Sequence, residues 1–172
     1  MLRLIVPFAA LLALCACAGT DTYVPKEEPS FYRDLAKAGA ELDAAAAASM
    51  ITGYRGNNGL SAVALDPELM RLAQAQAEVM AKRDKLDHSA GKPFIARLKN
   101  AGYDAEVAAE NISAGYHTLA EAFSGWRDSP PHRENMLLKG ATKIGIAAVY
   151  TPRSKYKVYW ALILAKPDDK QS

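Results

Sequence analysis

Two histidines and one glutamate, taken from three separate segments, are the residues of this chain whose types suit the chemistry of a site. His88 and His132 are two of only 3 histidines, and Glu110 lies between them in the segment Ala109–Ile112. Imidazole nitrogens and a carboxylate oxygen are common ligands of zinc, and the same groups carry out acid–base chemistry. Either use requires a fold that brings the three segments together.

Three interpretations of these residues stay open. In the first, His88, Glu110 and His132 hold zinc or another divalent cation, with the fourth coordination position free. In the second, the three side chains form a hydrogen-bonded polar cluster without a metal. In the third, the cluster supports metal-assisted hydrolysis by a peptidase or esterase, but spacing alone supplies no nucleophile, because Ser129 is better explained as a helix cap. We expect binding rather than catalysis.

The N-terminal residues have the features of an export signal. Arg3 and the apolar run Leu4–Leu14 match the basic start and hydrophobic region of a secretory signal, and the run is too short to span a bilayer. The segment Leu14–Cys17 resembles the lipobox of bacterial lipoproteins, with Cys17 as the lipidated residue. We therefore expect a lipid-anchored periplasmic protein, attached to the outer membrane because Ala18 is not the aspartate that retains lipoproteins at the inner one. Signal cleavage nearby without a lipid is the alternative.

Composition indicates one globular domain. The chain has 172 residues, of which 50% are hydrophobic, and both cysteines lie in the signal region, so the domain has no internal disulfide. Basic and acidic residues are interleaved, which argues against nucleic acid as a partner.

Removing residues 1–16 removes Arg3 and lowers the formal charge from +2 to +1, so we expect the lipid and not charge to be the anchor. We expect a tether over 17–30, a domain over 31–168 and a tail over 169–172; the oligomeric state stays open.

Helical periodicity and capping residues predict five helices. Alanine-rich residues 31–54 favour a long helix with an interruption near Gly39, and Asp66 with Pro67 starts a helix that runs to about Lys85. Residues 93–99 fit a short helix. Thr118 and Glu121 form a capping box for the next helix, and Ser129 can cap a last one over 130–138.

Two strands are predicted near the C-terminus, joined by a hairpin loop over 151–155. In residues 143–150 apolar side chains recur at every second position, as in a strand. Residues 156–165 are apolar on both faces, so this strand must be covered on both sides. We expect residues 106–116 to form a helical turn or loop around Glu110 and then a short extended piece. Helices around an antiparallel sheet predict an α+β fold, a three-layer α-β-α sandwich with a central antiparallel sheet.

Several short motifs occur in a fixed order between about Ala46 and Lys166. They are Tyr54-Arg55, Leu65–Leu69, His88, Ala109–Ile112 with Gly115, Trp126–Leu137, Ile144–Ile146 and Tyr159-Trp160. In this order and at these spacings they resemble the CAP superfamily of cysteine-rich secretory proteins, antigen 5 and pathogenesis-related 1 proteins, also called the SCP domain. The resemblance implies the same sandwich fold with a central cleft.

The resemblance implies that His88, Glu110 and His132 are three of the four cleft residues, which in the family are usually two histidines and two acidic residues. Ser129 stands where many eukaryotic members have the second glutamate, and we include Ser129 and Asn111 in the predicted cleft. The resemblance also implies a binding role for a lipid, a sterol or a cell-envelope component. Aromatic side chains could line such a groove or, alternatively, pack in the core; they are Tyr103, Tyr116, Tyr150, Tyr156, Tyr159 and Trp160.

Overall fold

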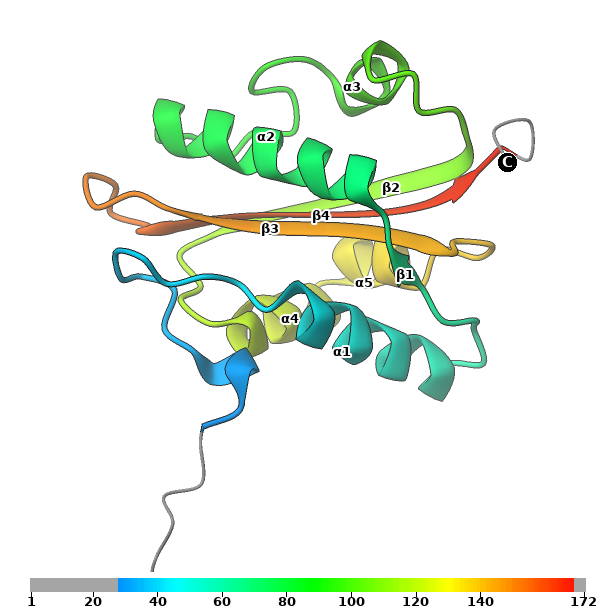
Figure 1. The fold of residues 1–172 in the computed structure, drawn as a ribbon, viewed down its shortest axis with the longest axis horizontal. Coiled ribbons are helices and arrows are strands. Elements are labelled where there is room, and N and C mark those ends of the chain that lie inside the picture. The colour runs from blue at the N-terminus through cyan, green and yellow to red at the C-terminus, as the bar shows by residue number, and fades with distance from the viewer. Residues whose placement is uncertain (1–27, 169–172) are drawn as a thin grey trace, which may run out of the picture.

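The computed structural model describes residues 28–168, in which a four-stranded sheet lies between two layers of helices (Figure 1). The predicted signal peptide, Cys17, residues 17–27 of the tether and the tail lie outside these residues. The three layers confirm the predicted α+β sandwich. The strands are β1 (Ala64–Leu65), β2 (Ala105–Ala114), β3 (Lys143–Tyr150) and β4 (Val158–Pro167), and their order in the sheet is β1-β3-β4-β2.

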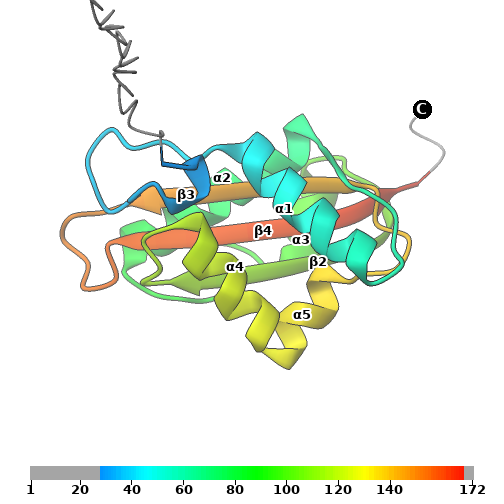
Figure 2. The ribbon, with the colours of Figure 1, turned by 90° about the horizontal axis from the view of Figure 1, so that it is seen from below.

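The helices divide between the two faces of the sheet (Figures 1 and 2). One face carries α2 (Pro67–Arg83) and α3 (Phe94–Asn100). The other carries a single 3-10 turn, η1 (Ser30–Tyr32), and three helices, which are α1 (Ala44–Asn57), α4 (Leu119–Asp128) and α5 (Pro130–Met136). The pairs β2–β4 and β3–β4 are antiparallel, and the short β1, which the sequence did not predict, pairs with β3 in parallel.

β4 is the centre of the core, as its two apolar faces predict. Trp160, Leu162 and Leu164 pack with the α1, α4 and α5 layer, and the alternate residues Tyr159 and Ile163 pack with the α2 layer. All five are almost completely buried. The sheet therefore separates two hydrophobic clusters, one on each of its faces.

α2 is fixed at both its start and its packing face. The Asp66 side chain accepts hydrogen bonds from the backbone N–H groups of Glu68 and Leu69, and Pro67 follows at the first helical position. Gly145 of β3 lies directly beneath, where an added Cβ would be only 2.2 Å from the carbonyl carbon of Leu69. Because glycine has no Cβ, the backbone of α2 can lie directly against β3 at this point, which fixes the position of the helix on the sheet.

The predicted helix over residues 31–54 is wrong in its first half, because α1 begins only at Ala44. Asp43 caps it by accepting a hydrogen bond from the Ala46 N–H at 2.9 Å, and Gly39 adopts φ 77°. Asp34 likewise accepts from the Ala36 N–H at 2.9 Å. These aspartates offer the backbone local hydrogen bonds that replace those of a helix.

The predicted helical turn around Glu110 is also wrong. Residues 105–114 form the ten-residue strand β2, in which Glu110 pairs with Ile163 of β4. Pairing with β4 outweighs the helix propensity of Ala108 and Ala109, because a strand partner supplies every second backbone group with a hydrogen bond. Consecutive side chains of a strand point to opposite faces, so the side chains of Glu110 and Asn111 face different helix layers.

Candidate functional site

Glu110 is a buried carboxylate on the edge strand β2, and its side chain is 2% exposed. Its Oε1 lies 2.9 Å from Nδ1 of His88, in the loop between α2 and α3. Its Oε2 accepts a hydrogen bond from Nη2 of Arg97 at 2.5 Å. A buried carboxylate is tolerated only when it is paired and hydrogen-bonded, and here both oxygens are.

Arg97 is a site residue that the sequence analysis missed. It lies on α3 with its side chain 11% exposed, and its Nε donates to the Lys92 carbonyl at 3.2 Å. Its guanidinium carbon lies 5.3 Å from the centroid of the Phe94 ring one turn earlier. The only signal in the sequence was a basic residue on the short helix after His88, and nothing in its spacing points to Glu110.

His88 combines a fixed orientation with exposure. A carboxylate only accepts hydrogen bonds, so Nδ1 of His88 carries the proton and donates it to Glu110. The side chain is nevertheless 53% exposed. Among the described residues no hydrogen bond involves Nε2, which is therefore the ring nitrogen free to meet a ligand.

α5 is held against the opposite face of β2 by two asparagines. Nδ2 of Asn111 donates to the His132 carbonyl at 2.8 Å. Nδ2 of Asn135 donates to the Glu110 carbonyl at 3.1 Å and to Oδ1 of Asn111 at 2.9 Å. These bonds tie the backbone of α5 at His132 to β2 beside Glu110.

The structure therefore joins two of the three predicted residues directly, whereas the third is tied to the neighbouring strand residue Asn111 through its backbone. His88 contacts Glu110, whereas no hydrogen bond among the described residues joins the His132 imidazole to Glu110. Ser129 precedes α5 at the N-cap position, but its side chain makes no capping hydrogen bond, contrary to the prediction. No hydrogen bond in residues 28–168 links Ser129 to either histidine. Asn111 reaches the site through the His132 backbone.

The aromatic side chains that were candidates for lining a groove do not gather at this site. Tyr103, Tyr159 and Trp160 are buried in the core, which supports the packing alternative. Four cavities lined by described residues lie elsewhere, and none of them is lined by His88, Glu110 or His132. The site is a polar cluster at a sheet edge with one exposed imidazole.

The predicted zinc ligands do not fit a metal. The carboxylate of Glu110 is shared between His88 and the guanidinium of Arg97, which already supplies the positive charge that a metal would bring. Within residues 28–168, no group of three or more His, Cys, Asp or Glu side chains is arranged to hold a metal ion. No hydroxyl group in this part of the chain is hydrogen-bonded to either imidazole, so we derive no hydrolytic step.

Calorimetric titration with zinc should accordingly give no saturable heat for the wild-type protein near neutral pH. The reason is that a zinc ion would have to displace Arg97 from Glu110 and leave the guanidinium buried without a carboxylate. The control is His132→Ala, which lacks one predicted ligand. Saturable heat in the wild type that disappears in His132→Ala would restore the metal hypothesis.

His132 should make stability depend on pH. Burial lowers the pKa of His132 below the usual 6.5, and the nearby His88 lowers this pKa further. Because the folded-state pKa is depressed, this contribution to stability is complete above the unfolded value and is lost as the pH falls through the folded pKa. Denaturation between pH 7 and pH 5 should show a smaller acid-induced loss in His132→Gln than in the wild type. An NMR titration midpoint of 6.5 or above for His132 would contradict this prediction.

Comparison with known proteins places these observations in a family. The model of the CAP family, the cysteine-rich secretory protein family, matches residues 48–164. The uncharacterized protein YkwD of Bacillus subtilis is 33% identical over 98 residues, which are 55% of this chain and 38% of that protein. The chain thus spans well under half the length of this curated relative.

Solved structures share the fold. An outer surface protein of Borrelia burgdorferi superposes with a TM-score of 0.66 at 19% identity, over 76% of this chain and 99% of that one. An extracellular protein of Bacillus anthracis containing a SCP domain gives a TM-score of 0.62 at 20% identity, over 71% of this chain and 39% of that one. None of the helices in residues 28–168 has both the length and the apolar character needed to cross a membrane.

Proposed function

Because the chain belongs to the CAP family, the cysteine-rich secretory protein family, we propose that it is an exported binding protein of the bacterial cell envelope with its site at His88, Glu110 and Arg97. The observation that carries the proposal is the half-exposed imidazole of His88, which a buried carboxylate holds in one orientation. Such an imidazole is prepared to meet a ligand without first being ordered, which lowers the entropic cost of binding.

The chemistry of the site favours hydrogen bonding over catalysis. Both carboxylate oxygens of Glu110 are engaged, Oε1 by His88 and Oε2 by Arg97, and within residues 28–168 no hydroxyl group is hydrogen-bonded to either imidazole. The lowered pKa of His132 keeps that ring neutral at pH 7, and the Nδ1 contact of His88 with Glu110 leaves the Nε2 of His88 for a ligand. The site therefore suits an envelope component that forms hydrogen bonds through hydroxyl or amide groups, such as a peptidoglycan fragment.

A test uses soluble peptidoglycan fragments as the probe and the protein purified from membranes in detergent. Wild type should bind a fragment saturably, and His88→Ala should weaken binding about tenfold, the effect of losing one hydrogen bond in a partly buried site. His117→Ala is the matched control, because His117 is an exposed histidine in the loop before α4. Equal affinity of all three proteins, or no binding by wild type, would refute the proposed site.

A hydrophobic ligand is the second candidate, and one cavity favours it. A cavity of about 510 Å³ lies between η1 and α1 and is lined largely by apolar groups, among them Phe31, Ala46 and Met50. A lipid acyl chain or a sterol is the kind of ligand that such walls accept. Native mass spectrometry of the membrane-extracted protein tests it, and the absence of any co-purifying lipid would count against this candidate.

Export and lipid anchoring remain proposals supported by the N-terminal residues. The apolar run and the Cys17 motif predict an anchored periplasmic protein of the outer membrane, and the two solved relatives are described as an outer surface and an extracellular protein. Labelling of growing cells with a radioactive fatty acid should mark the wild type and Cys15→Ser but not Cys17→Ser. Label that persists in Cys17→Ser would show that this cysteine is not the lipidated residue.

A further inference from the structure

One end of the molecule carries a concentration of positive charge that the composition of the whole chain hides. Residues 82–87 and 153–157 contain six basic and two acidic residues, a net charge of +4, which exceeds the +2 of the entire chain. We call the six basic side chains the basic surface; they are Lys82, Arg83, Lys85, Arg153, Lys155 and Lys157. The remainder of the chain is therefore net acidic.

The two segments of the basic surface are joined by hydrogen bonds of the Tyr159 hydroxyl. Tyr159, fully buried in β4, donates its hydroxyl hydrogen to Oδ1 of Asp84 at 2.5 Å, and its oxygen lies 3.2 Å from Oγ of Ser154. Ser154 is 2% exposed and belongs to the loop between β3 and β4. Because Asp84 ends α2, this contact ties the end of the helix to the loop.

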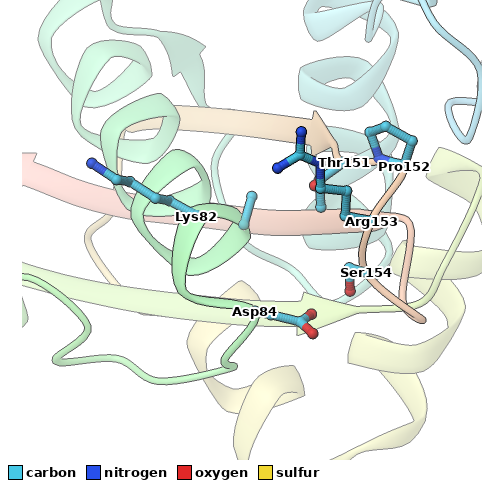
Figure 3. A pocket seen from close by; sticks show the side chains of 7 residues that line it. Lys82, Asp84, Thr151, Pro152, Arg153 and Ser154 are labelled. Carbon is cyan, nitrogen blue, oxygen red and sulfur yellow. The ribbon is translucent and has the colours of Figure 1, made fainter.

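An open cavity of about 390 Å³ lies between the end of α2 and the loop, with Asp84 and Ser154 among the residues that line it. Figure 3 shows Asp84 and Ser154 between the two segments, with Lys82 on the helix side and Arg153 on the loop side. Hydrogen bonds from Ser154 and Tyr159 lower the pKa of Asp84, so its carboxylate is charged and is engaged within the protein. Even with the exposed Asp84 charged, the two segments keep their net charge of +4.

The dipole of α2 explains only part of this concentration of basic residues. Cations near the C-terminus of α2 are favoured by the helix dipole, which accounts for Lys82 and Arg83. It does not account for the three basic residues of the loop. In the part of the chain that the structure describes, Lys82, Arg83 and Arg153 form no ion pair with a carboxylate, and all three are exposed.

The placement of the basic surface suggests its partner. Both views show the β3–β4 loop in the same half of the molecule as η1, where the described chain begins (Figures 1 and 2). We propose that the basic surface docks on the phosphate groups of an anionic phospholipid bilayer. Each basic side chain at such a bilayer strengthens binding about fivefold, so several together orient a domain without burying apolar surface. This surface is separate from the site at His88.

Flotation of the full chain with vesicles tests the proposal. Partition is measured with vesicles of phosphatidylcholine alone and with vesicles that also contain phosphatidylglycerol, and the ratio of the two partition coefficients cancels any contribution of the N-terminal residues that does not depend on charge. Lys82→Glu with Arg153→Glu should lower this ratio at least about tenfold. Raising the salt concentration should lower the wild-type ratio as well, because salt screens exposed charges.

The matched control is Lys99→Glu with Lys139→Glu. Both lysines are exposed and lie at the other end of the strands, near the start of β2 and the start of β3. The control should keep the wild-type ratio to within about twofold, since its total charge change is the same but its position is not. An equal fall in both double variants, or an unchanged ratio in Lys82→Glu with Arg153→Glu, would overturn the proposal. So would binding of free glycerol phosphate with no preference for the anionic vesicles.

Discussion

Replacing Arg55 with alanine should lower the free energy of unfolding by about 4 kcal/mol, among the largest effects of any single change in this chain. Arg55 on α1 is completely buried, and burial lowers its pKa. Its guanidinium donates four hydrogen bonds of 2.9 to 3.0 Å to backbone carbonyls. The acceptors are Ser61, Met136, Leu138 and Ala141. Removing it takes a charged donor away from four carbonyls, two of them in fully buried contacts, at about 1 kcal/mol each.

The effect of Arg55→Ala should reach the site, because three of these carbonyls belong to the end of α5 and the segment that follows it. α5 carries His132, so its NMR signal should shift in any folded fraction of the variant. Denaturation in urea measures the stability. Arg71→Ala is the control, since Arg71 lies on the exposed side of α2 and pairs with Glu68, and its loss should be below about 1 kcal/mol. A loss in Arg55→Ala no larger than this control would contradict the anchoring role.

Glu110→Gln and Arg97→Met should each lower the free energy of unfolding by about 3 kcal/mol. Each variant strands the other charge in a site where the two side chains are 2% and 11% exposed. The double variant removes both charges, so its loss should be smaller than the sum of the two single losses by about 2 kcal/mol. Urea denaturation of the four proteins gives this coupling energy.

A surface ion pair between β2 and β4 supplies the control for this cycle. Glu106 of β2 and Lys166 of β4 form an ion pair at 2.6 Å in which both side chains are more than one third exposed. Glu106→Gln should cost less than about 1 kcal/mol, because solvent screens this pair. Additive losses in the Glu110 and Arg97 variants would mean that the buried pair is not the unit we infer.

The sequence predicted correctly those elements whose start is determined by neighbouring residues. The Asp66-Pro67 start of α2 and the capping box of Thr118 and Glu121 are found as predicted, because a cap is defined by residues within one turn. The two-sided apolar pattern of β4 likewise placed it in the centre of the sandwich. These elements together make the fold class predictable.

Structure that depends on a distant partner was not predictable in the same way. β2 exists because β4 lies beside it, and no residue within 105–114 reveals that pairing. Arg97 meets Glu110 only because α3 is placed over the edge of β2, so a side chain 13 residues away became the second partner of the carboxylate. The zinc hypothesis did not take Arg97 into account for the same reason, since residue types alone do not show which cation a carboxylate faces.

The central claim is that Glu110 fixes His88 so that Nε2 is free for a ligand, and the tautomer of the His88 ring tests it most directly. Long-range ¹H–¹⁵N NMR spectra of the protein, recorded at a pH at which the ring is neutral, distinguish a protonated Nδ1 from a protonated Nε2. We predict protonation at Nδ1 in the wild type, because this nitrogen donates to Oε1 of Glu110 at 2.9 Å, and a gain of the Nε2-protonated form in Glu110→Gln. A wild-type ring protonated at Nε2, or a tautomer unaffected by Glu110→Gln, would contradict the account.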